Sequence, residues 1–192
     1  MQRQAWLAAA VVGAVAGGIA IGAAQSANAS NSDAPSLEAN GHKFYAPGQI
    51  DGAWRAVTKD YPAALPAGVT FPRKAPGFFH DAATGGDKIQ GWEDGFPATI
   101  AAQYWRCAWL YDDLHPTSSI DAGSASASAH ADALAQAQLQ QYVGLPGVSL
   151  GESQFSSDMA TIAQKMGVSK AQAEYQVNCG PEIYVPGNGA GE

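Results

Sequence analysis

The spacing of apolar residues predicts helices over most of the second half of the chain. The clearest amphipathic stripe repeats at helical intervals and consists of Phe155, Met159, Ile162 and Met166. Gly167 should end that helix, and Ser169 should cap the next one, which is expected to run to about residue 178. An Ala-rich helix should precede both and end at Gly144.

Residues 99–114 are apolar around most of a helical wheel, which is typical of a buried helix. Only Ala102, Arg106 and Asp113 form a narrow polar strip, which we expect to remain exposed. Trp109→Ala should then leave a cavity and lower the free energy of unfolding by roughly 3–5 kcal/mol. Arg106→Ala should cost no more than about 0.5 kcal/mol, because exposed positions tolerate truncation. A strand with period-two spacing is the alternative, and the length of the segment favours the helix.

The region before this segment begins with a short helix and continues as extended chain. Asp51 is placed to cap a helix over residues 52–61, whose inner face carries Trp54, Val57 and Tyr61. Four prolines then exclude a helix or a central strand, namely Pro62, Pro66, Pro72 and Pro76. This segment should lie across the core with three aromatic anchors, which are Phe71, Phe78 and Phe79. A glycine-rich loop should follow over residues 81–95.

These elements predict a mainly α fold with four to five helices, a proline-rich extended segment and one disulfide. We expect a single globular domain over residues 42–185, preceded by a flexible leader over residues 30–41 and followed by a loose tail over residues 186–192. A chain of 192 residues is long enough for one domain with an ordinary hydrophobic core.

The first 29 residues have the pattern of an export signal. Arg3 precedes an uncharged stretch over residues 6–21, and Ala27 and Ala29 occupy the small-residue positions of a cleavage site after Ala29. Cleavage would leave a mature chain that is secreted or held at the cell surface. The alternative is an uncleaved N-terminal anchor, although Ala and Gly contribute little to membrane insertion. No segment of the mature chain is apolar enough to span a membrane.

The charge balance narrows the range of partners. A net charge of -7 opposes nucleic-acid binding, which requires a basic surface. Residues 162–177 resemble the helix-turn-helix of bacterial repressors, but this stretch has no excess of positive charge. Any two short helices that join at a capped glycine turn give the same pattern. We therefore expect no nucleic-acid partner.

Cys107 and Cys179 are the two cysteines of the chain. In an exported protein an even pair is expected to form a disulfide. Such a bond would tie the helix over residues 99–114 to the end of the last helix. Two unpaired thiols are the alternative.

Asp112, Asp113 and His115 form the most compact group of acidic and imidazole side chains. Asp112 and His115 are three residues apart, so they are able to meet at a helix end as two metal ligands or as an acid–base pair. No third ligand follows at a recognisable spacing, and we predict no metal and no cofactor. The plainer interpretation is a solvated helix end before Pro116.

The pattern as a whole favours an exported, non-enzymatic binding or surface-interaction protein, whose partner is a protein or a cell-surface glycan. Trp92, in the glycine-rich loop, is the best candidate for an exposed binding aromatic. The alternative function is an exported hydrolase or metal-dependent enzyme centred on Asp112, Asp113 and His115. A cleft that joins these three groups to a further acid or histidine would favour the enzyme.

The Ala/Gly-rich export signal, the proline-spaced segment and the aromatic helix around Cys107 resemble small exported actinobacterial proteins of unknown function. The resemblance lies in the overall sequence pattern over most of the chain and includes no catalytic motif. It therefore implies an exported protein and no particular activity.

Overall fold

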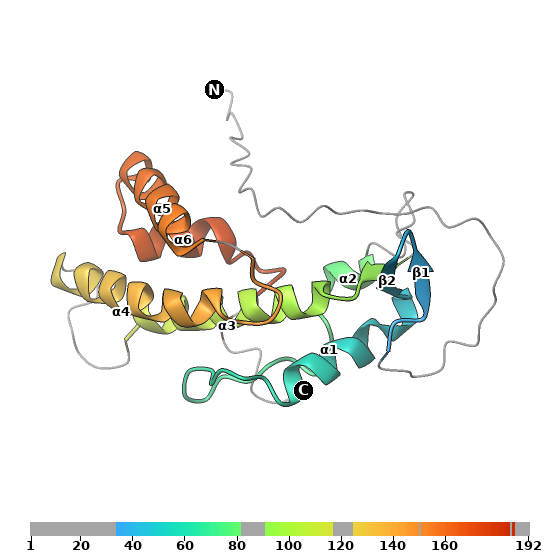
Figure 1. The fold of residues 1–192 in the computed structure, drawn as a ribbon. Helices are drawn as coiled ribbons and strands as arrows, with labels where there is room; N and C mark the ends of the chain where they lie inside the picture. Colours follow the sequence, from blue (N-terminus) through green and yellow to red (C-terminus); the bar gives the residue numbers. More distant parts are fainter. Residues whose placement is uncertain (1–33, 82–90, 117–124, 150, 185, 187–192) are drawn as a thin grey trace, which may run out of the picture.

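The computed structural model describes residues 34–81, 91–116, 125–149, 151–184 and 186. Within these ranges the chain forms six α-helices, one short 3-10 helix and a small antiparallel sheet of three strands (Figure 1). The predicted mainly helical class is confirmed. The expected export signal over residues 1–29 and the tail from residue 187 lie outside the described ranges. No helix in those ranges combines the length and the apolar character needed to cross a bilayer.

The first described elements form a β-hairpin. β1 (Leu37–Ala39) pairs antiparallel with β2 (His42–Tyr45), and Asn40 and Gly41 form the turn with φ values of 54° and 80°. Asn-Gly favours this turn because both residues tolerate positive φ. The expectation of a flexible leader is therefore wrong for residues 37–41. β3 (Trp92–Glu93) pairs antiparallel with the other edge of β2.

The proline-rich segment lies between α1 (Ile50–Lys59) and α2 (Phe78–Asp81), and it is extended or turning as predicted. Its backbone is tied to the core by side-chain hydrogen bonds. The Trp54 indole donates to the Pro72 carbonyl at 2.7 Å, and the Tyr104 hydroxyl donates to the Thr70 carbonyl at 2.9 Å. Asp51 does not cap α1, because its Oδ1 instead accepts from the backbone N–H of Ala75 at 2.9 Å.

α3 (Phe96–Leu114) is the central element of the fold, since α1, α4 (Ala125–Val143) and α6 (Lys170–Asn178) all pack against it (Figure 1). The side facing α1 contains the main hydrophobic core, which includes Trp54, Phe79, Ile100, Tyr104 and Cys107. A smaller cluster joins α3 to α4 and α6 through Leu110, Ala131, Ala135 and Ala171. The predicted buried helix is confirmed in this segment.

α5 (Glu152–Met166) and α6 join at the turn that the sequence predicts. Gly167 has a left-handed φ of 69° at the end of α5, and the Ser169 hydroxyl accepts from the backbone N–H of Gln172 at 3.1 Å. The apolar stripe of α5 is only partly covered, because Met159 is buried while Met166 is 41% exposed. The apolar face of α5 is thus not fully enclosed by the rest of the fold.

Candidate functional site

The acid–imidazole group at the end of α3 is divided between the surface and the interior of the protein. Asp112 and His115 are exposed, whereas Asp113 is buried against α4 and is only 6% exposed. The His115 ring stacks on Tyr111, and its Nδ1 lies 2.9 Å from the Tyr111 carbonyl oxygen. In the described part of the chain, no three His, Cys, Asp or Glu side chains are arranged to hold a metal ion. The three predicted site residues are therefore not brought together.

The strip that we expected to be exposed on α3 is buried. Ala102 is fully covered, Arg106 is 3% exposed and Asp113 is 6% exposed, so the sequence-based expectation is wrong for all three. α4 and α6 pack over this side of α3. The sequence of α3 alone gives no sign of these neighbours, because a helical wheel does not show which helices approach from elsewhere in the chain.

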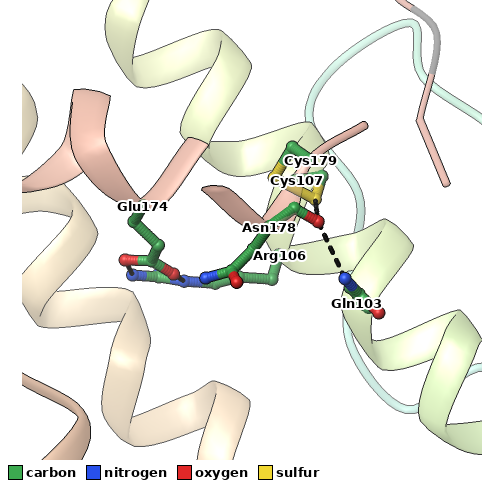
Figure 2. The surroundings of a disulfide bond; sticks show 6 residues. All are labelled: Gln103, Arg106, Cys107, Glu174, Asn178 and Cys179. Carbon is green, nitrogen blue, oxygen red and sulfur yellow. Dashed lines mark hydrogen bonds and ion pairs between the residues drawn. A yellow bond between two sulfur atoms is a disulfide. The ribbon is translucent and has the colours of Figure 1, made fainter. Parts of the chain in front are cut away.

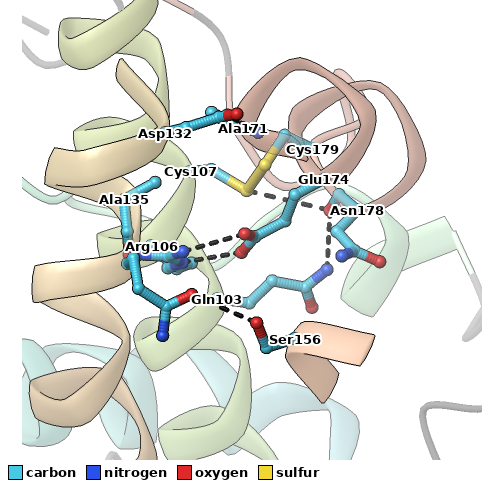
Figure 3. Close-up of polar contacts among 11 residues, drawn as sticks. Gln103, Arg106, Cys107, Asp132, Ala135, Ser156, Ala171, Glu174, Asn178 and Cys179 are labelled. Carbon is cyan, nitrogen blue, oxygen red and sulfur yellow. Dashed lines mark hydrogen bonds and ion pairs between the residues drawn. A yellow bond between two sulfur atoms is a disulfide. The ribbon is translucent and has the colours of Figure 1, made fainter. Parts of the chain in front are cut away.

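Arg106 forms a buried ion pair with Glu174 of α6 (Figures 2 and 3). Its Nε donates to Glu174 Oε1 at 2.6 Å and its Nη2 donates to Oε2 at 2.8 Å. Nη1 donates to the backbone carbonyl of Ala135 in α4 at 3.0 Å. One guanidinium group thus joins α3, α4 and α6, and its paired geometry is the strong, bidentate kind.

The predicted disulfide between Cys107 and Cys179 is confirmed, with Cα atoms 5.5 Å apart. It connects the middle of α3 to the residue that follows α6 (Figure 2). Gln103, one turn earlier on α3, donates from Nε2 to the Asn178 carbonyl at 2.7 Å. The C-terminal end of α6 is therefore held on α3 by a covalent bond and a hydrogen bond.

A small hollow with a volume of about 20 Å³ lies among α3, α4, α5 and α6, beside the ion pair. Phe155, Met159 and Leu139 contribute apolar walls, and Arg106 and Glu174 contribute charged atoms. Pockets that enclose drug-sized ligands usually measure roughly 300–1000 Å³, so this hollow is far too small for such a role. Arg106 and Glu174 already neutralise each other, and Asp132 and Lys170, which also line the hollow, carry opposite charges, so the lining has no excess charge to hold a charged ligand.

The first turn of α6 receives a second cap from a neighbouring helix. Asp132 of α4 accepts from the backbone N–H of Ala171 through Oδ1 at 2.7 Å, close to the ion pair (Figure 3). Free N–H groups at helix N-termini require such partners, and a carboxylate is favoured there by the helix dipole. Asp132 therefore fixes the start of α6, while the disulfide fixes its end.

We expect Asp132→Ala to lower the free energy of unfolding by about 1–2 kcal/mol, because it leaves the Ala171 N–H without its acceptor. Asp132→Asn retains an acceptor oxygen at the same place, so its free energy of unfolding should fall much less. Urea denaturation of both variants measures the difference. Equal losses for the two variants would show that the carboxylate charge matters here and the cap does not.

Trp92 and Trp109 differ in exposure from the sequence-based expectation. Trp92 is half-buried and stacks on Phe96 with ring centroids 5.2 Å apart, so it is not the freely exposed aromatic that we expected. Trp105 is buried, whereas Trp109 is half-buried at the surface of α3. The indole N–H groups of both donate to the Ala64 carbonyl, at 2.7 and 3.0 Å.

Comparison with protein-family models, with curated proteins and with solved structures found no match to this chain. None of the three therefore suggests a reaction, a ligand or a site. The side chains of the protein itself remain the guide to its function.

Proposed function

We propose that this chain is an exported, non-enzymatic binding protein whose contact surface is centred on Trp109. The observation that carries the proposal is a half-buried indole whose only polar atom already donates to the Ala64 carbonyl. The part of the ring that remains accessible is apolar. Fixed aromatic rings of this kind provide large contact area at low entropic cost, and Trp is enriched among residues that dominate binding energy.

The packing behind Trp109 supports this role because it holds the ring in one orientation. Trp105 contacts it edge-on with centroids 6.4 Å apart, and Tyr142 of α4 stacks parallel to Trp105 at 6.5 Å. The Arg106 guanidinium lies 5.9 Å from the centre of the Tyr142 ring. A ring that is already ordered in the free protein loses little conformational freedom when a partner binds.

The positions of the ionisable side chains favour binding over the alternative enzyme. Asp113 faces α4 and is separated from the exposed Asp112 and His115. Arg106 and Glu174 already form an ion pair with each other. The enzyme hypothesis needs these acids to converge on a substrate, and this arrangement gives it no support. Export is supported by the disulfide, since such bonds persist in oxidising compartments, and by the N-terminal sequence pattern.

A protein partner fits this surface better than a glycan. Trp109 packs against a hydrophobic cluster that includes Ala63, and Leu65 packs against the same cluster. A sugar ring stacks on Trp but also needs hydrogen-bonding groups for its hydroxyls, and the indole N–H is already occupied. We therefore propose an apolar patch on an extracytoplasmic protein as the partner.

We expect Trp109→Ala to weaken binding to the surface of the producing cells at least tenfold, as loss of a central aromatic contact does. The same change should lower the free energy of unfolding by about 2 kcal/mol, roughly half the cost of truncating a fully buried Trp. Fluorescently labelled residues 30–192, titrated onto washed cells, measure the affinity. Circular dichroism confirms that the variant is folded at the assay temperature.

Met166→Ala is the matched control, because Met166 is an exposed apolar side chain on α5. It should bind like the unchanged protein. Protease treatment of the cells should abolish binding, whereas glycosidase treatment that abolishes it would indicate a glycan partner. Unchanged binding by folded Trp109→Ala, or no saturable binding by the unchanged protein, would contradict the proposal.

A further inference from the structure

Two buried side-chain oxygen atoms lie close together where α3 meets α4. Asp113 Oδ2 and Gln138 Oε1 are both enclosed, and neither has a partner among the described residues. The two side chains are neighbours, since Gln138 Nε2 donates to Asp113 Oδ1 at 3.4 Å. Buried polar atoms are nearly always paired, because an unpaired one costs roughly 1–3 kcal/mol.

One added proton satisfies both atoms. We propose that Asp113 and Gln138 form a proton-dependent contact between α3 and α4, in which Asp113 takes up a proton from solvent on Oδ2. The resulting O–H donates to Gln138 Oε1, while Gln138 Nε2 continues to donate to Oδ1. The acid and the amide then pair through two hydrogen bonds. Loss of the proton returns a buried carboxylate that faces an amide oxygen, and the contact weakens.

The charges around Asp113 come from the two helices that form this contact. Arg106 and Asp112 act on it from α3, and His130 acts on it from α4. Arg106 lies in its own ion pair with Glu174 of α6, so it is not free to neutralise Asp113 directly. Asp113 also lies in the last turn of α3, where the helix dipole disfavours negative charge.

Burial disfavours the charged carboxylate more than the neighbouring groups stabilise it, and it raises the pKa of Asp113 from 3.8 to about 6. The hydrogen bond from Gln138 and the charges of Arg106 and His130 lower this pKa, while Asp112 raises it. Because the folded protein holds the proton more tightly than the unfolded chain, its stability is greatest on the acid side. That advantage is lost as the pH rises from about 4 through 6.

The experiment compares the pH dependence of unfolding in the unchanged protein and in Asp113→Asn, using urea denaturation between pH 4 and 8. Asn pairs with the Gln138 amide through the same two hydrogen bonds and does not titrate. We expect the ratio of the two unfolding equilibrium constants to change by about tenfold per pH unit between pH 4 and 6 and then to level off. Asp60→Asn, at an exposed carboxyl that directly follows α1, should leave the profile of the unchanged protein intact, because Asp60 is not among the charges that act on Asp113.

A second measurement on the unchanged protein is independent of whether the variant folds. Carbon-13 NMR of the Asp113 carboxyl should give a midpoint near pH 6, and the side-chain amide of Gln138 should titrate with the same midpoint. A common midpoint would support the acid–amide contact. An Asp113 midpoint below 4.5, or a Gln138 amide that does not respond to pH, would overturn it. The inference concerns the internal packing and does not depend on the proposed binding function.

Discussion

Arg106→Ala should lower the free energy of unfolding by about 3–5 kcal/mol, because it leaves a buried carboxylate without its partner. Glu174 is 5% exposed and accepts two charge-assisted hydrogen bonds from Arg106. The change also removes the hydrogen bond from Nη1 to the Ala135 carbonyl and leaves a cavity beside Tyr142. Urea denaturation that gives both the midpoint and the slope measures the loss.

Two further variants separate the possible causes of this loss. Arg55→Ala removes an exposed arginine from α1 and should change stability by no more than about 0.5 kcal/mol. The double change Arg106→Met with Glu174→Leu removes both charges and should recover most of the loss, because an apolar pair of similar volume avoids the desolvation cost. If the double variant is as unstable as Arg106→Ala, lost packing explains the effect and the unpaired carboxylate does not.

Elements that depend on nearby residues were predicted well from the sequence. The junction of α5 and α6 follows from Gly167 and Ser169, whose conformation and capping act within one helical turn. The extended segment between α1 and α2 follows from its four prolines, since each fixes φ and removes a donor. The disulfide follows from the count of cysteines and the expected compartment rather than from distance.

Features that depend on distant partners were predicted wrongly. The local sequence around Arg106 is typical of an exposed position on a helix. Its partner Glu174 lies 68 residues later in the chain, and only the fold brings the two side chains together. Asp51 lies where a helix cap is expected in the sequence, but its side chain accepts a hydrogen bond from the backbone N–H of Ala75, 24 residues away. Trp92 occupies a glycine-rich stretch, and the fold brings Phe79 of α2 against its ring.

The N-terminal hairpin was missed for a different reason. Its turn signal, Asn40-Gly41, was present in the sequence, but β1 has only three residues. A strand of this length carries too few positions to show the alternation on which strand prediction relies. Pairing with β2 stabilises β1 instead, and β2 pairs on its other edge with β3, whose residues Trp92 and Glu93 lie far along the chain.

Removal of the disulfide should lower the free energy of unfolding about as much as Arg106→Ala does. The bond closes a loop over a sequence separation of 72 residues, for which the chain-entropy model gives about 4 kcal/mol. The appropriate variant replaces both Cys107 and Cys179 with Ala, because Cys107 is fully buried and Ser would place an unpaired hydroxyl there. For a domain of this size the melting temperature should fall by roughly 8–16 °C.

Calorimetry with and without a reducing agent tests whether the bond itself is responsible. Reductant should lower the melting temperature of the unchanged protein towards that of the double-alanine variant and should leave the variant unaffected. The effect acts mainly on the unfolded chain, so the α6 contacts of Glu174 and Asp132 should persist in the variant at low temperature. A variant with an unchanged melting temperature would show that those contacts hold α6 on α3 without covalent help, and that the disulfide contributes little to the stability of the fold.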